Sequence, residues 1–201
     1  TMLSKITSGA TSALGDIEME GYSSDNLSLM VEKITAGATS ALDEIQLEGF
    51  SSDNLSSMVQ EITSGATGAL DEIEMAGFDP STDVFSMTEK VILGTTGALS
   101  EIEMDGYDSD DLEGMIEGVT TGAMSAINEL QSAGLDQNNM SNMMKSISSS
   151  ASKGLSRLEN SKLLDNASKL PGLLNTITSS TLRATKEIKV QGFDPNDSAI
   201  L

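Results

Sequence analysis

The chain has no cysteine, no histidine and no tryptophan among its 201 residues, and only 3% of them are aromatic. Without cysteine there is no disulfide framework, no thiolate nucleophile and no sulfur-ligated zinc. Without histidine, the commonest general base and zinc ligand is missing as well. No motif marks a serine or threonine as a nucleophile, and no glycine-rich loop follows a strand to cradle phosphate. These absences argue against an enzyme.

Positive charge is scarce along most of the chain, whose formal net charge is −20. Residues 1–134 carry 25 acidic and 3 basic side chains, whereas residues 135–201 carry 6 acidic and 8 basic ones. Such a balance disfavours nucleic acid and anionic membranes as partners. It is typical of a solvated acidic surface, and it also allows the acidic part to attract a mixed-charge protein. We therefore expect a protein partner or self-association, and no nucleic acid.

Long apolar runs are also missing, because none approaches the roughly 20 residues that a membrane-spanning helix needs. The sequence therefore predicts no transmembrane segment. The chain begins at Thr1 without a visible signal peptide, and its first and last residues fall inside the pattern described below. We expect a piece of a longer array, or a domain capped by other residues, in an extracytoplasmic location: periplasmic, cell-surface or secreted.

The dominant feature that is present is an internal repeat with a period of about 28–29 residues. Six glycines recur at this period, with one double interval before the last: Gly21, Gly49, Gly77, Gly106, Gly134 and Gly192. Five of the six aromatic residues directly follow one of these glycines: Tyr22, Phe50, Phe78, Tyr107 and Phe193. Residues 1–134 hold regular repeats, and residues 135–201 hold divergent, more basic ones. We expect a single helical-repeat domain over residues 1–201.

Each repeat has the pattern of one long helix. Ser51 and Asp79 stand where a side chain can cap a helix start, and Pro80 falls at a first helical position, where its missing N–H costs nothing. Apolar residues follow at helical spacing, and a glycine in the left-handed conformation ends the pattern. The spacing predicts helices of about 22–25 residues. Connections of three or four residues then place consecutive helices antiparallel.

A second glycine recurs in the middle of these predicted helices, where glycine costs about 0.5–1 kcal/mol relative to alanine. The positions concerned are Gly9, Gly37, Gly65, Gly94 and Gly122. A close crossing between consecutive antiparallel helices would offset that cost through dispersion contacts between the backbones. A hinge is the competing interpretation. We favour close crossing, because hinges at one level of every helix would loosen the whole domain.

The best chemical candidate is a calcium site in the segment "MDGYDSDDLEGM". It gathers the hard oxygen ligands that Ca²⁺ requires, contributed by Asp105, Asp108, Asp110, Asp111 and Glu113. The spacing is not that of an EF-hand, so acids that stabilise a helix start are the preferred interpretation. Carboxylate pairs such as Asp43/Glu44 and Asp71/Glu72 recur once per repeat, which argues for structure rather than one assembled active site. The recurring methionines have the spacing of core residues.

The sequence therefore predicts an all-α fold of about seven long antiparallel helices, stacked as a helical repeat or an elongated bundle. The expected function is a non-enzymatic scaffold or protein-interaction module, without a cofactor. Two alternatives stay open: a calcium-responsive binding module that uses acidic loops between helices, and a carrier of an apolar ligand.

Overall fold

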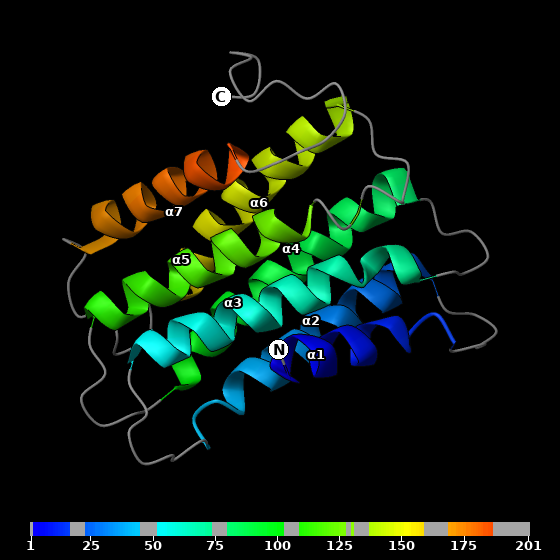
Figure 1. Ribbon diagram of the computed structural model, residues 1–201, viewed down its shortest axis with the longest axis horizontal. Helices are drawn as coiled ribbons and strands as arrows, with labels where there is room; N and C mark the ends of the chain where they lie inside the picture. The colour runs from blue at the N-terminus through cyan, green and yellow to red at the C-terminus, as the bar shows by residue number, and fades with distance from the viewer. Residues whose placement is uncertain are drawn as a thin grey trace.

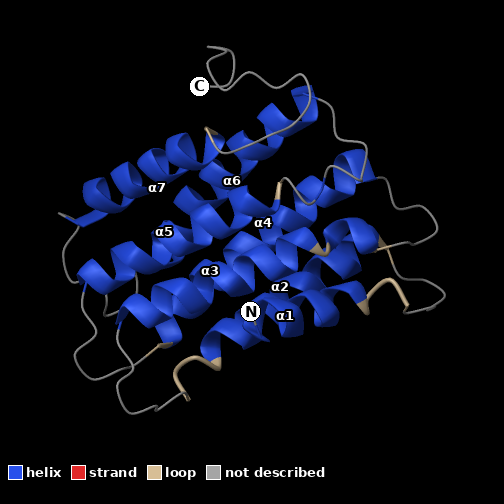
Figure 2. Cartoon of the chain, viewed as in Figure 1, coloured by secondary structure: helices blue, strands red, loops and turns tan. Residues whose placement is uncertain are grey.

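A computed structural model describes residues 2–16, 23–44, 52–73, 80–102, 109–127, 130, 137–158 and 169–186. These residues form an all-helical fold, as predicted, and contain no strand (Figure 2). The described part holds seven α-helices: α1 (Met2–Ser12), α2 (Ser24–Ser40), α3 (Ser52–Gly68), α4 (Pro80–Ala98), α5 (Ser109–Ala126), α6 (Gln137–Leu158) and α7 (Leu170–Thr185). Two short 3₁₀ segments follow α3 and α4: η1 (Leu70–Glu72) and η2 (Leu99–Glu101).

The helices form two layers, with the odd-numbered helices in one and the even-numbered helices in the other (Figure 1). The most extensive contacts join helices that are two places apart in the chain: α3 with α5, α2 with α4, α4 with α6, α1 with α3, and α5 with α7. Contacts between consecutive helices are fewer and cross from one layer to the other. The stack thus has α1 and α2 at one end and α6 and α7 at the other.

The hydrophobic core lies between the two layers and contains almost no aromatic side chains. In α3 the apolar side chains recur every three or four residues, and Leu55, Val59, Ile62 and Ala66 are fully buried. Such spacing places them on one face of a helix, which is why this segment packs as a helix. The predicted role of methionine as a core residue is confirmed for three members of the series, which are fully buried: Met87, Met115 and Met143.

The predicted capping chemistry is seen at the start of α2, whereas Lys169 before α7 makes no side-chain cap. Ser23 caps α2: its side chain accepts a hydrogen bond from the backbone N–H of Asn26, and the Asn26 side chain accepts one from the backbone N–H of Ser23. This reciprocal pair satisfies two N–H groups that the helix itself leaves unbonded. Pro80 is the first residue of α4, as predicted. The proposed capping residues Ser51 and Asp79 lie outside the described residues, and so do the six repeat glycines that begin with Gly21.

The predicted helix length is too great for all the described helices except α6, which has 22 residues. The helix α2 ends at Ser40 after 17 residues, and hydrogen-bonded turns continue to Glu44. In α3 and α4, tighter 3₁₀ turns take the place of the last predicted α-helical turn. The leucine in each of these end segments is buried: Leu42, Leu70 and Leu99. The pattern that we assigned to one helix therefore contains a helix followed by a tighter turn. Side chains in such a turn point in other directions than they would in an α-helix.

Close crossing at the mid-helix glycines is confirmed for Gly65, Gly94 and Gly122. A Cβ atom on Gly65 would lie 2.9 Å from the Cα of Ser4 in α1, and one on Gly122 would lie 2.5 Å from the carbonyl oxygen of Gln60 in α3. A Cβ on Gly94 would overlap the carbonyl oxygen of Glu32 in α2. The predicted partner is wrong, however. Each glycine faces the helix two places earlier in its own layer, not the preceding helix.

The prediction is also wrong for Gly9 and Gly37, where a Cβ would meet nothing within 4 Å. The physical reason is their place in the stack: α1 and α2 have no helix two places before them among the described residues. Three further contacts were not predicted. Gly114 and Gly118 of α5 lie against Ser56 of α3, and Gly154 of α6 lies against Thr96 of α4.

Alanine substitution should therefore have opposite effects at two glycines that hold the same place in the sequence pattern. Gly94→Ala should lower the free energy of unfolding by about 1–3 kcal/mol, because the new methyl group must push α4 away from α2. Gly37→Ala should raise it by up to about 0.5–1 kcal/mol, because alanine favours the helix and the site is open. Urea denaturation of both variants measures this difference. A destabilisation of equal size at both positions would contradict close crossing.

Candidate interaction surfaces

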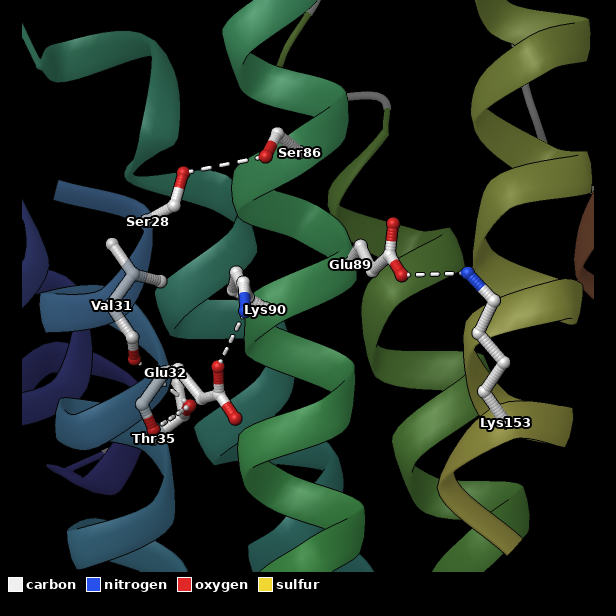
Figure 3. Close-up of polar contacts among 8 residues, drawn as sticks. All are labelled: Ser28, Val31, Glu32, Thr35, Ser86, Glu89, Lys90 and Lys153. Carbon is white, nitrogen blue, oxygen red and sulfur yellow. Dashed lines mark hydrogen bonds and ion pairs between the residues drawn. The ribbon is translucent and has the colours of Figure 1, made fainter. Parts of the chain in front are cut away.

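The outer side of the even-numbered layer carries polar contacts that join helices two places apart (Figure 3). Glu32 of α2 pairs with Lys90 of α4 at 2.9 Å, and Glu89 of α4 pairs with Lys153 of α6 at 2.8 Å. The Lys90 and Glu32 side chains are 34% and 16% exposed, so solvent only partly screens this pair. Ion pairs near the surface contribute about 0–1 kcal/mol each. Their main effect is to fix how far one helix is displaced along its neighbour.

Hydroxyl groups make the same kind of link within the even-numbered layer. The Oγ atoms of Ser28 in α2 and Ser86 in α4 lie 3.4 Å apart, close enough for one to donate a hydrogen bond to the other (Figure 3). Further along the chain, Ser40 at the end of α2 donates a hydrogen bond to Glu101 in η2, which follows α4. The contacts therefore run in the same order along α2 and along α4 with its 3₁₀ segment.

The odd-numbered layer shows the same arrangement. Ser12 of α1 donates to Glu72 at the end of α3, and Thr176 of α7 donates to Glu113 of α5. Arg183 of α7 pairs with Glu117 of α5. The carboxylates at helix ends thus differ from a pair of catalytic acids: Glu72 and Glu101 each bind a hydroxyl group of the helix two places earlier. This result supports the structural interpretation of the recurring carboxylates.

The candidate calcium ligands fall into two groups. Asp105 and Asp108 lie outside the described residues. Asp110, Asp111 and Glu113 lie in the first turns of α5, where Asp110 pairs with Lys169 at 3.4 Å and Glu113 accepts a hydrogen bond from Thr176. Within the described ranges, no group of three or more acidic side chains is placed to hold a metal ion. Asp110 and Glu113 are instead directed towards residues of α7 and the residue before it.

A cavity of about 150 Å³ lies between α6 and α7, at one end of the stack. Its lining mixes apolar side chains with hydroxyl groups and one cation: Met144, Lys145, Ser148, Thr178, Thr181, Leu182 and Thr185. Pockets that hold small-molecule ligands usually measure about 300–1,000 Å³. The cavity is therefore small for a carrier of an apolar ligand.

Exposed large apolar side chains gather at the two ends of the stack. Among the described residues they are Met2 and Ile6 of α1, Leu29 of α2, and Leu174 and Leu182 of α7. Repeat proteins usually close their ends with a polar outer face. Both ends of this stack instead present large apolar side chains.

Neither the protein-family models nor the curated proteins with which the chain was compared match it. In the part of the chain that the structure describes, no helix combines the length and the apolar character needed to cross a lipid bilayer.

The calcium hypothesis has a direct test. We expect at most millimolar binding of Ca²⁺, because Asp110 and Glu113 have partners elsewhere and the spacing is not that of a preorganised site. Calorimetric titration of the protein and of Asp108→Asn/Asp110→Asn with CaCl₂ measures the affinity. Micromolar binding that the double variant abolishes would contradict the expectation and favour a calcium-responsive module.

Proposed function

We propose that this protein is a non-enzymatic helical-repeat scaffold or protein-interaction module that works outside the cytoplasm, as an exported or cell-surface protein. The observation that supports it best is a recurring contact between helices two places apart. A glycine of each of α3, α4, α5 and α6 lies against the helix two places earlier, and polar links join most of these pairs and also α5 with α7. When successive helices make the same contact, further repeats of the sequence can extend the stack. Extended surfaces that bind proteins are the common use of such arrays.

The contacts support a repeating unit of about 28–29 residues. The polar links described above join residues 58 to 66 positions apart, which is about two units. The burial pattern is consistent with this spacing, because Leu27, Leu55, Val84 and Leu112 hold equivalent places in four successive units and are all buried. We infer that each unit contributes one helix and that units alternate between the two layers.

The order of the contacts supports antiparallel consecutive helices. In α1 and α3, Ser4 lies against Gly65, and further towards the ends of both helices Ser12 contacts Glu72. The two helices therefore run in the same direction. A chain that alternates between layers through connections of a few residues then has consecutive helices in opposite directions.

The outward positions of the middle helices carry polar side chains, which suit a polar protein surface as the partner. Ser57 and Gln60 of α3 are exposed, and Glu117 and Thr121 of α5 are partly exposed. The cavity between α6 and α7 is too small to support the carrier hypothesis, and the partners of Asp110 and Glu113 disfavour the calcium hypothesis.

The absence of histidine and cysteine from the whole sequence supports the non-enzymatic part of the proposal, because it removes two of the commonest catalytic side chains. The proposal also includes an extracytoplasmic location. It rests on the high acidic charge and on the absence of cysteine, a composition that is common among exported bacterial proteins.

Removal of two units in register tests the proposal. Deletion of residues 38–94 joins Gly37 to Thr95 and removes two units without changing the side of the helix that faces the core. We expect a folded, helical protein with a cooperative but lower melting transition, because the extensive contacts of each helix are with helices one and two places away in the chain. Circular dichroism and calorimetry measure both properties.

A matched control removes residues 38–92 instead. It shifts the following residues by two positions, about 200° around a helix, and so turns their apolar face towards water. This control should lose its cooperative transition. Failure of the in-register deletion to fold would contradict a repeat scaffold. Recovery of a stoichiometric lipid by organic extraction of the purified full chain would favour the carrier instead.

A further inference from the structure

The helices α1 and α2 form one end of the stack. They leave uncovered the surface that, in the middle helices, packs against the helix two places earlier. We call this surface the N-terminal face. It is defined by six exposed residues of α1, α2 and the turns that follow them: Lys5, Gly9, Asp16, Lys33, Gly37 and Glu44. Gly9 and Gly37 hold the same places in the sequence pattern as Gly65 and Gly94, two units earlier. The later two glycines receive the backbone of another helix, and the first two receive nothing.

Apolar side chains on the same two helices are exposed to a degree that is unusual in this molecule. Met2 is 75% exposed, Ile6 is 58% exposed and Leu29 is 49% exposed. This end of the stack therefore combines exposed apolar area with a strip where another backbone can approach closely. Both features favour a helical partner.

The charges on the N-terminal face are arranged so that it complements itself. Lys33 stands one helical turn before Gly37, and Glu44 stands two turns after it. Lys5 and Asp16 have the same spacing around Gly9. If a second copy crosses antiparallel one or two residues beyond each glycine, each lysine lies about 8 Å from the crossing point along the helix, and each acid, in the tighter turns after the helix, lies about 8–10 Å from it. The lysine of one copy then lies opposite the acid of the other.

The opposite end of the stack lacks this complementarity. Lys145 borders the cavity between α6 and α7, and Lys186 at the end of α7 is exposed. A head-to-tail arrangement would bring these cations towards Lys5 and Lys33. Like charges at an interface disfavour a partner, so the observations favour a symmetric, face-to-face arrangement.

We propose that two copies of this protein associate through their N-terminal faces about a two-fold axis, with α1 antiparallel to α1 and α2 antiparallel to α2 of the second copy. Such an interface is closed, because the same patch is used by both copies. Two helices of 11 and 17 residues present roughly 400 Å² on each copy, taking a helix as about 10 Å wide. The two copies together then bury roughly 800 Å², which is below the roughly 1,200 Å² of stable specific interfaces and places this one with weak, transient contacts. The dimer is therefore weak, with a dissociation constant on the order of 10–100 µM.

Analytical ultracentrifugation of the full chain over a concentration series, from about 1 to 500 µM around that range, tests this arrangement. Lys33→Glu should weaken the dimer at least about tenfold, because it places like charges opposite each other. The charge exchange Lys33→Glu/Glu44→Lys should restore it, since only an arrangement that pairs these two positions is insensitive to the exchange. Gly37→Leu should abolish the dimer, and circular dichroism should show that it stays folded, because its site is open.

The matched control is Leu182→Glu on α7, which should leave the dimer unchanged. A protein that is monomeric at every concentration would overturn the proposal, and so would a dimer that Leu182→Glu disrupts or one that the charge exchange fails to restore. The proposed dimer rests on the proposed scaffold function, and it identifies the protein partner of that scaffold as a second copy of the chain. A monomeric protein that tolerates the in-register deletion would overturn the dimer alone, whereas failure of that deletion would overturn the scaffold.

Discussion

Close approach of the backbones of helices two places apart is the constraint on which the rest of this structure depends. Gly65, Gly94 and Gly122 remove the side chain where two backbones meet, and Gly118 and Gly154 extend the same contact along α5 and α6. Such proximity increases the dispersion contacts between helices, which offsets the low helix propensity of glycine. It also brings short side chains within reach of the neighbouring helix. Hydroxyl groups such as those of Ser12 and Ser40 can then reach a carboxylate on the adjacent helix.

The sequence predicted the kind of fold because its strongest signals are local. Apolar residues at helical spacing identify helices, the proline at position 80 falls at a helix start, and methionine fills the core. The partner of each glycine could not be predicted in the same way. A glycine in a helix indicates close approach, but nothing in its surroundings tells whether the preceding helix or the one before it approaches. The correct partner follows only from the two-layer arrangement, which also explains why Gly9 and Gly37 are open.

At the candidate sites, too, the sequence predicted some features and could not predict others. The recurrence of carboxylates at helix ends indicated a structural role, and Glu72 and Glu101 make the structural links that such a role requires. The calcium hypothesis placed weight on a cluster of acids in the sequence, yet the partners of Asp110 and Glu113 come from a distant part of the chain, at and just before α7. The exposure of Ile6 results from its place in the stack, because Ile62 and Val91 hold the same place in later units and are buried. Leu29 differs, because Ser57 and Ser86 hold its place in later units and are exposed as well.

The most direct test of the account is whether α2 and α4 are as close as their side chains indicate. The Oγ atoms of Ser28 and Ser86 lie 3.4 Å apart, and the chain has no cysteine of its own, so Ser28→Cys/Ser86→Cys introduces two thiols and no others. Mild oxidation should close an intramolecular disulfide, detected by mass spectrometry. The bond should raise the free energy of unfolding by up to about 4 kcal/mol, the value expected for a loop of this length. Two thiols that stay reactive, or that form only disulfides between molecules, would contradict close packing of helices two places apart.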